Sequence, residues 1–186
     1  TKSRHVSPSY VDKDGNQYLA SSDRPFPTID INHLRLHEGR AYYVYHTHPD
    51  NGRLAVGSSI NIAIAFPAGI EAHAVIDYQC GGEAEIYIYE APTTSGGTAM
   101  TIHRRNRSLT TTSAGAAVLN PTVTNVGTEF YSELITSAEG SGNRSGAGGR
   151  GFSFEFVLKP LTTYLFRLTN VNASSQMAEI RVDWYE

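Results

Sequence analysis

Apolar and polar residues alternate with a period of two along most of this chain. A period of two places the apolar residues on one face of a strand, and antiparallel sheets commonly bury only that face. No window shows the 3.6-residue stripe of an amphipathic helix, so no helix is predicted. The even-numbered apolar residues of 152–158 and 178–184 are expected to face the core. The clearest alternating runs span 60–66, 84–90, 152–158, 162–169 and 178–184, with weaker ones over 72–80 and 129–136.

Turn-forming clusters such as 49–52, 67–69 and 172–175 separate these runs. Short strands at this spacing predict an all-β fold, namely an antiparallel β-sandwich that is jelly-roll-like, over residues 33–186. Residues 1–32 are polar and contain Pro25-Phe26-Pro27, which cannot be helical. We interpret them as an extended N-terminal arm that orders against a neighbouring molecule, with a disordered tail as the alternative. Tyr10, Tyr18 and Phe26 are the predicted partner-binding residues of the arm.

Composition narrows the class of protein. The 186 residues carry 15 Lys+Arg against 18 Asp+Glu, a formal net charge of −3, which argues against a general nucleic-acid binder. The single Cys80 excludes an internal disulfide framework. No apolar run approaches the roughly 18 residues that span a bilayer, and Thr1–His5 lack the apolar stretch of a secretion signal. These features predict a soluble protein made in a reducing cytoplasm, without a membrane partner.

His46 and His48 lie two residues apart, on one face of a strand, where they could share a metal ion. His46-Thr47-His48-Pro49 resembles the core of the zinc isopeptidase motif, but Val56 and Ser59 stand where that motif needs Ser and Asp. A cupin would need a Glu shortly after the second His, and none is present. We therefore predict no metal site and no cofactor, and interpret the two histidines as a strand end.

Carboxylates offer little evidence for catalysis. Nothing in the sequence places two of them at a catalytic separation, and no Gly-x-Ser-x-Gly elbow is present. We therefore predict that the protein is not an enzyme and has no catalytic residue. The carboxylates considered are Asp77, Glu83, Glu85, Glu90 and Glu155.

Arg104, Arg105 and Arg107 form the most basic cluster of the sequence. They are predicted to bind phosphate or the acidic face of a protein partner, with a solvated turn as the alternative. The glycine-rich stretch 140–151 lacks the Gly-Lys-Ser/Thr ending of a phosphate-binding loop and is expected to be a long exposed loop between strands.

Several stretches, taken in order from His33 to Glu186, resemble the head decoration, or cement, proteins of tailed bacteriophages. This resemblance covers about four-fifths of the chain and leaves out residues 1–32. The stretches are 33–42, the 83–90 strand with its Thr-Ser-Gly-Gly-Thr loop, 105–108, 120–123, 154–159, 163–170 and the closing Asp183-Trp184-Tyr185-Glu186.

The resemblance implies a virion structural protein that binds the outer surface of the capsid and stabilises it against internal DNA pressure. It implies the major capsid protein as partner and no direct contact with nucleic acid. We expect a homotrimer, because local threefold positions of an icosahedral shell select one, with a dimer at twofold positions as the alternative. The competing hypothesis is a tail-associated or carbohydrate-binding sandwich that uses Tyr42, Tyr87 and Tyr89 as sugar platforms. An enzyme built on the same sandwich ranks third.

Overall fold

The computed structural model describes residues 9–11, 17–19, 31–48, 52–136, 147–148 and 155–186. The chain divides into two compact units, Thr1–Leu34 and Arg35–Glu186. In the first unit, β1 (Ser9–Val11) pairs antiparallel with β2 (Gln17–Leu19). None of the described helices is long and apolar enough to cross a membrane.

One short helix, α1 (Ile31–His37), spans the junction of the two units, although the sequence pattern predicted no helix. Seven residues make only two turns, which is too short to produce a recognisable apolar stripe. The amide of Gly39 donates to the carbonyl of Leu36 (3.1 Å), and the amide of Arg40 donates to that of Arg35 (2.9 Å). These two bonds form a Schellman motif, which requires the left-handed conformation of Gly39 (φ 73°).

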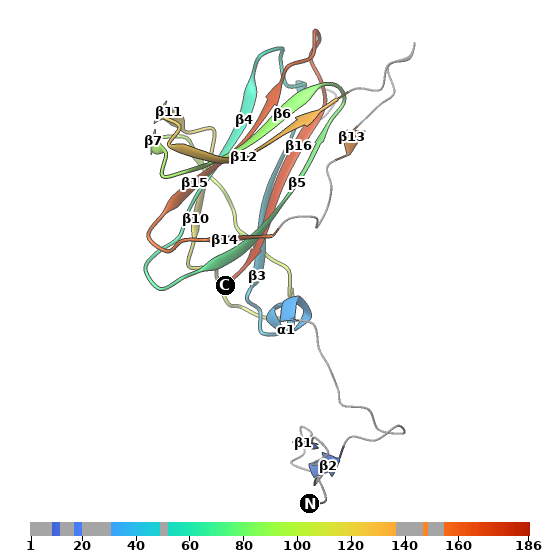
Figure 1. Cartoon of the computed structure of the whole chain (residues 1–186), viewed down its shortest axis with the longest axis vertical. Helices are drawn as coiled ribbons and strands as arrows, with labels where there is room; N and C mark the ends of the chain where they lie inside the picture. Colours follow the sequence, from blue (N-terminus) through green and yellow to red (C-terminus); the bar gives the residue numbers. More distant parts are fainter. Residues whose placement is uncertain (1–8, 12–16, 20–30, 49–51, 137–146, 149–154) are drawn as a thin grey trace, which may run out of the picture. The chain divides into compact units, whose positions relative to one another are not determined.

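The second unit is a sandwich of two antiparallel sheets (Figure 1). The first sheet has the order β12-β6-β15-β4-β10-β8. Its strands are β12 (Thr128–Ile135), β6 (Ala84–Glu90), β15 (Thr163–Asn170), β4 (Ser59–Ala65), β10 (Ala116–Leu119) and β8 (Thr98–Ala99).

The second sheet has the order β13-β5-β16-β3-β9, and β14 also pairs with β5. A separate two-stranded ribbon is formed by β7 (Thr93–Ser95) and β11 (Thr122–Asn125). The strands of the second sheet are β13 (Ala147–Gly148), β5 (Ala72–Cys80), β16 (Ala178–Tyr185), β3 (Ala41–His48), β9 (His103–Arg104) and β14 (Phe156–Leu158).

The pairing of the principal strands is that of a jelly roll. Counted along the chain, these eight strands are β3, β4, β5, β6, β12, β14, β15 and β16. The first pairs with the last, the second with the seventh, the third with the sixth and the fourth with the fifth. Such nested pairing is one long antiparallel ribbon rolled into two sheets. The predicted all-β, jelly-roll-like sandwich is therefore confirmed.

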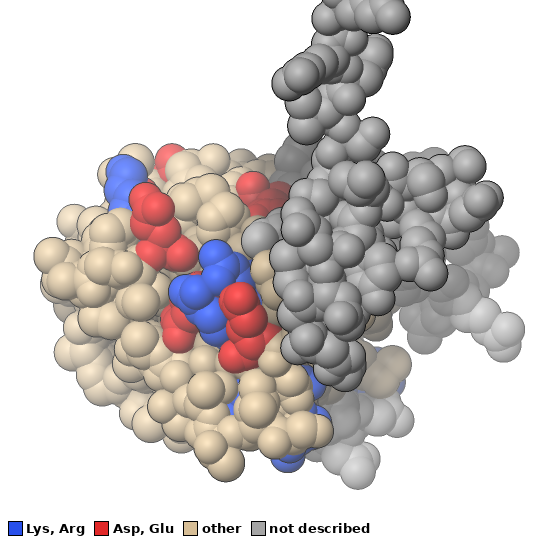
Figure 2. Space-filling model, turned by 90° about the horizontal axis from the view of Figure 1, so that it is seen from below, with Lys and Arg blue, Asp and Glu red and all other residues tan. Residues whose placement is uncertain are grey.

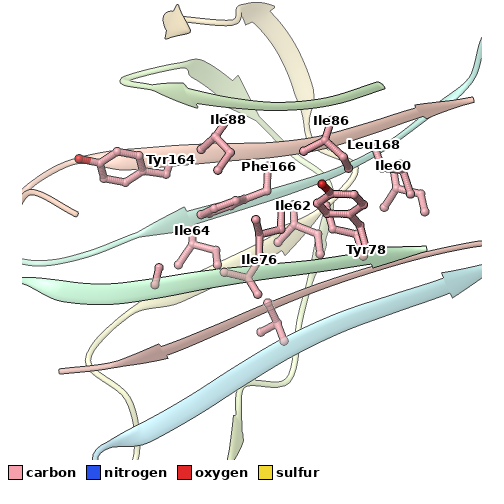
Figure 3. Packing of buried hydrophobic residues seen from close by; sticks show 14 of the residues in the cluster. Ile60, Ile62, Ile64, Ile76, Tyr78, Ile86, Ile88, Tyr164, Phe166 and Leu168 are labelled. Atoms are coloured by element: carbon pink, nitrogen blue, oxygen red, sulfur yellow. The ribbon is translucent and has the colours of Figure 1, made fainter. Parts of the chain in front are cut away.

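The core lies between the sheets, where the alternating apolar residues meet (Figure 3). Ile60, Ile62 and Ile64 of β4 are fully buried against Phe166 and Leu168 of β15 and residues of the facing sheet. Burying each such side chain contributes roughly 1.5–3 kcal/mol. The predicted inward residues of 178–184 are all buried. In 152–158, Leu158 is buried and Phe156 packs against the core, whereas Phe152 and Phe154 lie outside the described residues.

Candidate functional site

The predicted basic cluster forms a turn in which two of its three arginines are already engaged. Arg104 donates from Nε to the carbonyl of Asn106 (2.7 Å), and its guanidinium also binds the carbonyl of Thr111. Arg105 forms an ion pair with Asp183, with 3.9 Å between Nη1 and Oδ1. Arg107 is exposed and has no ion pair within the described part of the chain. Of the three, Arg107 therefore offers its charge most directly to a partner.

This arginine turn is fixed to the segment where the sandwich begins. Asn106 donates from Nδ2 to the carbonyl of His37 (3.3 Å), and Thr111 donates from Oγ1 to that of Gly39 (2.8 Å). Beside the turn lies a groove of about 650 Å³. Its lining combines Met100 and Ile102, which pack against the core, with Arg107 and polar loop residues.

Charges on the face shown in Figure 2 are mixed: the basic side chains near its centre lie directly beside acidic ones. Of the predicted arm residues, Tyr10 and Tyr18 stand directly opposite each other in the β1–β2 ladder. Phe26 lies outside the described residues, as does most of the 140–151 stretch.

His46 and His48 do lie on one face of β3, with ring centroids 4.8 Å apart. Burial, and then the neighbouring His48, lower the pKa of His46, which favours its neutral form. His48 contacts the carbonyl oxygen of Gly52 through Nδ1 (2.6 Å). Within the described residues, no group of three potential metal ligands occurs.

The carboxylates considered for catalysis are dispersed. Glu85 accepts a bond from Tyr87 (2.9 Å), and Glu90 pairs with Lys159 (2.7 Å). At the other sheet, Glu155 lies 2.6 Å from His73 Nδ1 and accepts a bond from the Tyr185 hydroxyl (2.5 Å). These contacts tie strands and loops together and place each carboxylate beside a different partner.

One surface of the second sheet gathers aromatic rings that the sequence pattern did not indicate. On β3, Tyr43 and Tyr45 stack at 6.1 Å, and His103 of β9 lies 5.1 Å from Tyr43 and 5.7 Å from Tyr45. The Tyr45 side chain is 48% exposed. We call this surface, the outer side of β9, β3, β16 and β5, the exposed face.

Charged residues continue the exposed face across β16 and β5. Arg181 donates from a terminal nitrogen to Asp183 (2.7 Å), and its guanidinium lies 4.7 Å from the centre of the Tyr43 ring. Asp77 stands opposite Arg181 in the ladder. Burial, and then Asp183, raise the pKa of Asp77. The guanidinium of Arg181 is thus shared between an aromatic ring and a carboxylate, beside a second carboxylate.

The opposite side of the sandwich has a similar group of tyrosines and an arginine, but the β7–β11 ribbon packs over it. Tyr87 and Tyr89 of β6 stack at 5.7 Å, and Arg167 of β15 lies 5.6 Å from the Tyr89 ring centre. Val123 of β11, together with Val126, packs onto a small second core of Ala63, Tyr89 and Leu165. We call this outer side of β4, β15 and β6 the covered face.

The predicted sugar platforms are in part wrong. Tyr42 points into the main core and is only 3% exposed, and Tyr89 is 8% exposed beneath the β7–β11 ribbon. Tyr87 is half-buried beside it. The run Tyr42-Tyr43-Val44-Tyr45 has apolar residues at every position, so period two alone did not indicate which tyrosines face outward. The contacts of the Tyr43 and Tyr45 rings with His103 become visible only in the folded structure.

No family model matches this chain, and comparisons with curated proteins and with solved structures also give no match.

Proposed function

We propose that this protein is a structural component of a bacteriophage virion that binds the outer surface of the capsid and stabilises it. The resemblance of residues 33–186 to head decoration proteins supports this proposal, and the jelly-roll sandwich agrees with what the resemblance implies. In this role the chain performs no chemistry. It acts by bracing neighbouring capsid subunits from outside.

The observation that carries the proposal is the position of the arginine turn. Its bonds to the carbonyls of His37 and Gly39 fix it beside the residues that connect the sandwich to the N-terminal unit. Residues 1–32, the other segment predicted to bind a partner, directly precede this connection in the sequence. Two weak contacts that engage together give an avidity that exceeds either one alone.

The partner is proposed to be the major capsid protein, through an acidic area of its outer surface. Arg107 supplies the exposed guanidinium, and arginine binds carboxylates through paired hydrogen bonds. One sandwich offers little contact area compared with the roughly 1,600 Å² of a standard stable interface. We therefore propose a homotrimer at threefold positions of the shell, with a dimer at twofold positions as the alternative.

Binding to undecorated capsids tests this function. Arg107→Glu is expected to weaken capsid binding by tenfold or more, because it places a like charge against the shell. Lys159→Glu is the matched control, since it changes the net charge equally at a lysine that is 68% exposed. Equal binding by wild type and both variants would contradict the role of the turn.

Virions made with and without the protein test stabilisation directly. Virions that lack it should lose DNA at a lower temperature and under milder osmotic shock. Deleting residues 1–32 should weaken capsid binding or lower the mass of the oligomer in solution. If both stay unchanged, these residues are a plain tail rather than an arm.

A further inference from the structure

The exposed face presents two rows of side chains in register across three strands. Tyr45, Arg181 and Asp77 form one row, and Thr47, Glu179 and Gln79 form the next. Tyr45, Thr47 and Gln79 are exposed. The sheet thus holds the ring of Tyr45 beside a set of hydroxyl, amide, carboxylate and guanidinium groups.

This combination matches the chemistry of a sugar ring. A pyranose has one face of C–H bonds, which packs on an aromatic ring, and a rim of hydroxyl groups that both donate and accept hydrogen bonds. Tyr45 is suited to the first role because Tyr43 and His103 hold its ring in place at 6.1 and 5.7 Å. A ring that is already ordered loses little conformational entropy on binding.

A hollow of about 230 Å³ lies along these rows, and Arg181 in its lining stands opposite Tyr45 in the ladder. It is lined by Asp77, Tyr78, Gln79, Glu179 and Arg181. Its volume is below the roughly 300–1,000 Å³ of pockets for drug-sized ligands, which suits a single ring of a longer chain. Arg181 binds Asp183, so the Asp77 carboxylate keeps accepting capacity for a ligand hydroxyl. The raised pKa of Asp77, caused by burial and then by Asp183, agrees with an incompletely solvated carboxylate.

Charge decides which saccharides fit. The carboxylates of Asp77, Glu179 and Asp183 outnumber the guanidinium groups of Arg105 and Arg181. The excess negative charge repels uronic and sialic acids, so a ligand with uncharged rings is favoured.

We propose that the exposed face binds a neutral saccharide chain, with one ring stacked on Tyr45 and the next bonded to Asp77 and Glu179. This activity goes beyond binding to the capsid and depends on residues other than Arg107. On a virion surface it would attach the particle to a glycan-coated surface.

Immobilised maltohexaose, cellohexaose and chitohexaose test the proposal, with polygalacturonate as the anionic probe. The full chain is expected to bind at least one neutral hexasaccharide and to bind polygalacturonate more weakly. Tyr45→Ala should lower that affinity roughly tenfold or more, as expected for loss of a central aromatic contact. Phe130→Ala is the matched control, because Phe130 is an aromatic residue of comparable exposure (40%) on β12 of the other sheet.

Asp77→Asn provides a second variant that keeps the size of the side chain, and it should weaken binding several-fold. Circular dichroism and oligomer mass should match wild type for every variant compared. The proposal is overturned if no neutral hexasaccharide binds, if polygalacturonate binds best, or if Tyr45→Ala binds as well as Phe130→Ala. Loss of capsid binding in Tyr45→Ala, without any saccharide binding by wild type, would instead make the face a protein-docking surface.

Discussion

The two outer sides of the sandwich carry nearly the same set of residues with opposite surroundings. On the exposed face, Arg181 stands opposite Tyr45 in the ladder and lies over the ring of Tyr43. On the covered face, Arg167 stands opposite Tyr87 and lies over the ring of Tyr89. Each arginine thus reaches a tyrosine two residues from the one it faces.

The difference is the β7–β11 ribbon. The ribbon packs on the residues of the covered face and makes them a second core, in which Leu165 is 0% exposed and Tyr89 is 8% exposed. On the other side, Tyr45 stays half in solvent. A similar arrangement of two tyrosines and an arginine is therefore buried on one face and left exposed on the other, and the segment that covers the sheet decides which.

The largest contrast is expected from truncating one tyrosine on each face. Tyr89→Ala should cost about 3 kcal/mol, because it opens a cavity beneath the ribbon. Tyr45→Ala should cost less than about 1 kcal/mol, because its ring is already half exposed. Urea unfolding of both variants measures the difference. Equal losses would mean that the ribbon does not stabilise the face it covers.

A substitution at Gly127, which lies between β11 and β12, should disturb the β7–β11 ribbon where it joins the main sheet. Its φ is 84°, and an added Cβ would lie 2.1 Å from the carbonyl oxygen of Glu90. Gly127→Ala should therefore cost about 2 kcal/mol or more, since backbone strain and a backbone clash combine. Gly69→Ala is the control, because Gly69 has a similar φ of 78° with nothing within 4 Å. Thermal unfolding should show a clearly larger loss for Gly127→Ala.

Alternation along the strands was enough to predict the sandwich, because Ile60, Ile62 and Ile64 can be buried together only if β4 is extended with one face inward. The same rule could not distinguish Tyr87 from Tyr45. Both face outward, and the period of a strand contains no information on whether a distant ribbon lies above it. The prediction that Tyr42 is exposed was wrong for another reason. Residues 42–45 are all apolar, so their pattern fits a strand with either face inward. His103 joins Tyr43 only through the pairing of β9 with β3.

The arginines should also differ between the faces. Arg181→Met should cost about 1–2 kcal/mol, because Arg105, at 3.9 Å, is then the one ion-pair partner left to the buried carboxylate of Asp183 among the described residues. Arg167→Met removes a bond to the neutral amide of Asn61 (2.7 Å) and should cost less than about 1 kcal/mol. In a double-mutant cycle, Asp183→Asn should recover part of the Arg181→Met loss. No recovery would show that the guanidinium acts mainly by packing.

The smallest effect is a pH dependence on the exposed face. The pKa of Asp77 is raised above its ordinary value of 3.8 by burial and then by Asp183, so the ionised carboxylate destabilises the folded state. Asp77→Asn should therefore stabilise the protein at pH 7, within about 0.5 kcal/mol. This gain should shrink as the pH falls through the raised pKa and vanish below the ordinary one. A gain of the same size at all pH values would attribute it to something other than ionisation.

The nested pairing of the strands also limits when this protein can fold during its synthesis. Ala41, at the start of β3, pairs with Tyr185, at the end of β16. The second sheet therefore cannot close until β16 has left the ribosome exit tunnel. Its long-range pairing also belongs to the class that folds slowly, on the order of milliseconds to seconds. Chains whose second sheet is still open therefore persist for that time after β16 emerges, and chaperones can act on them during it.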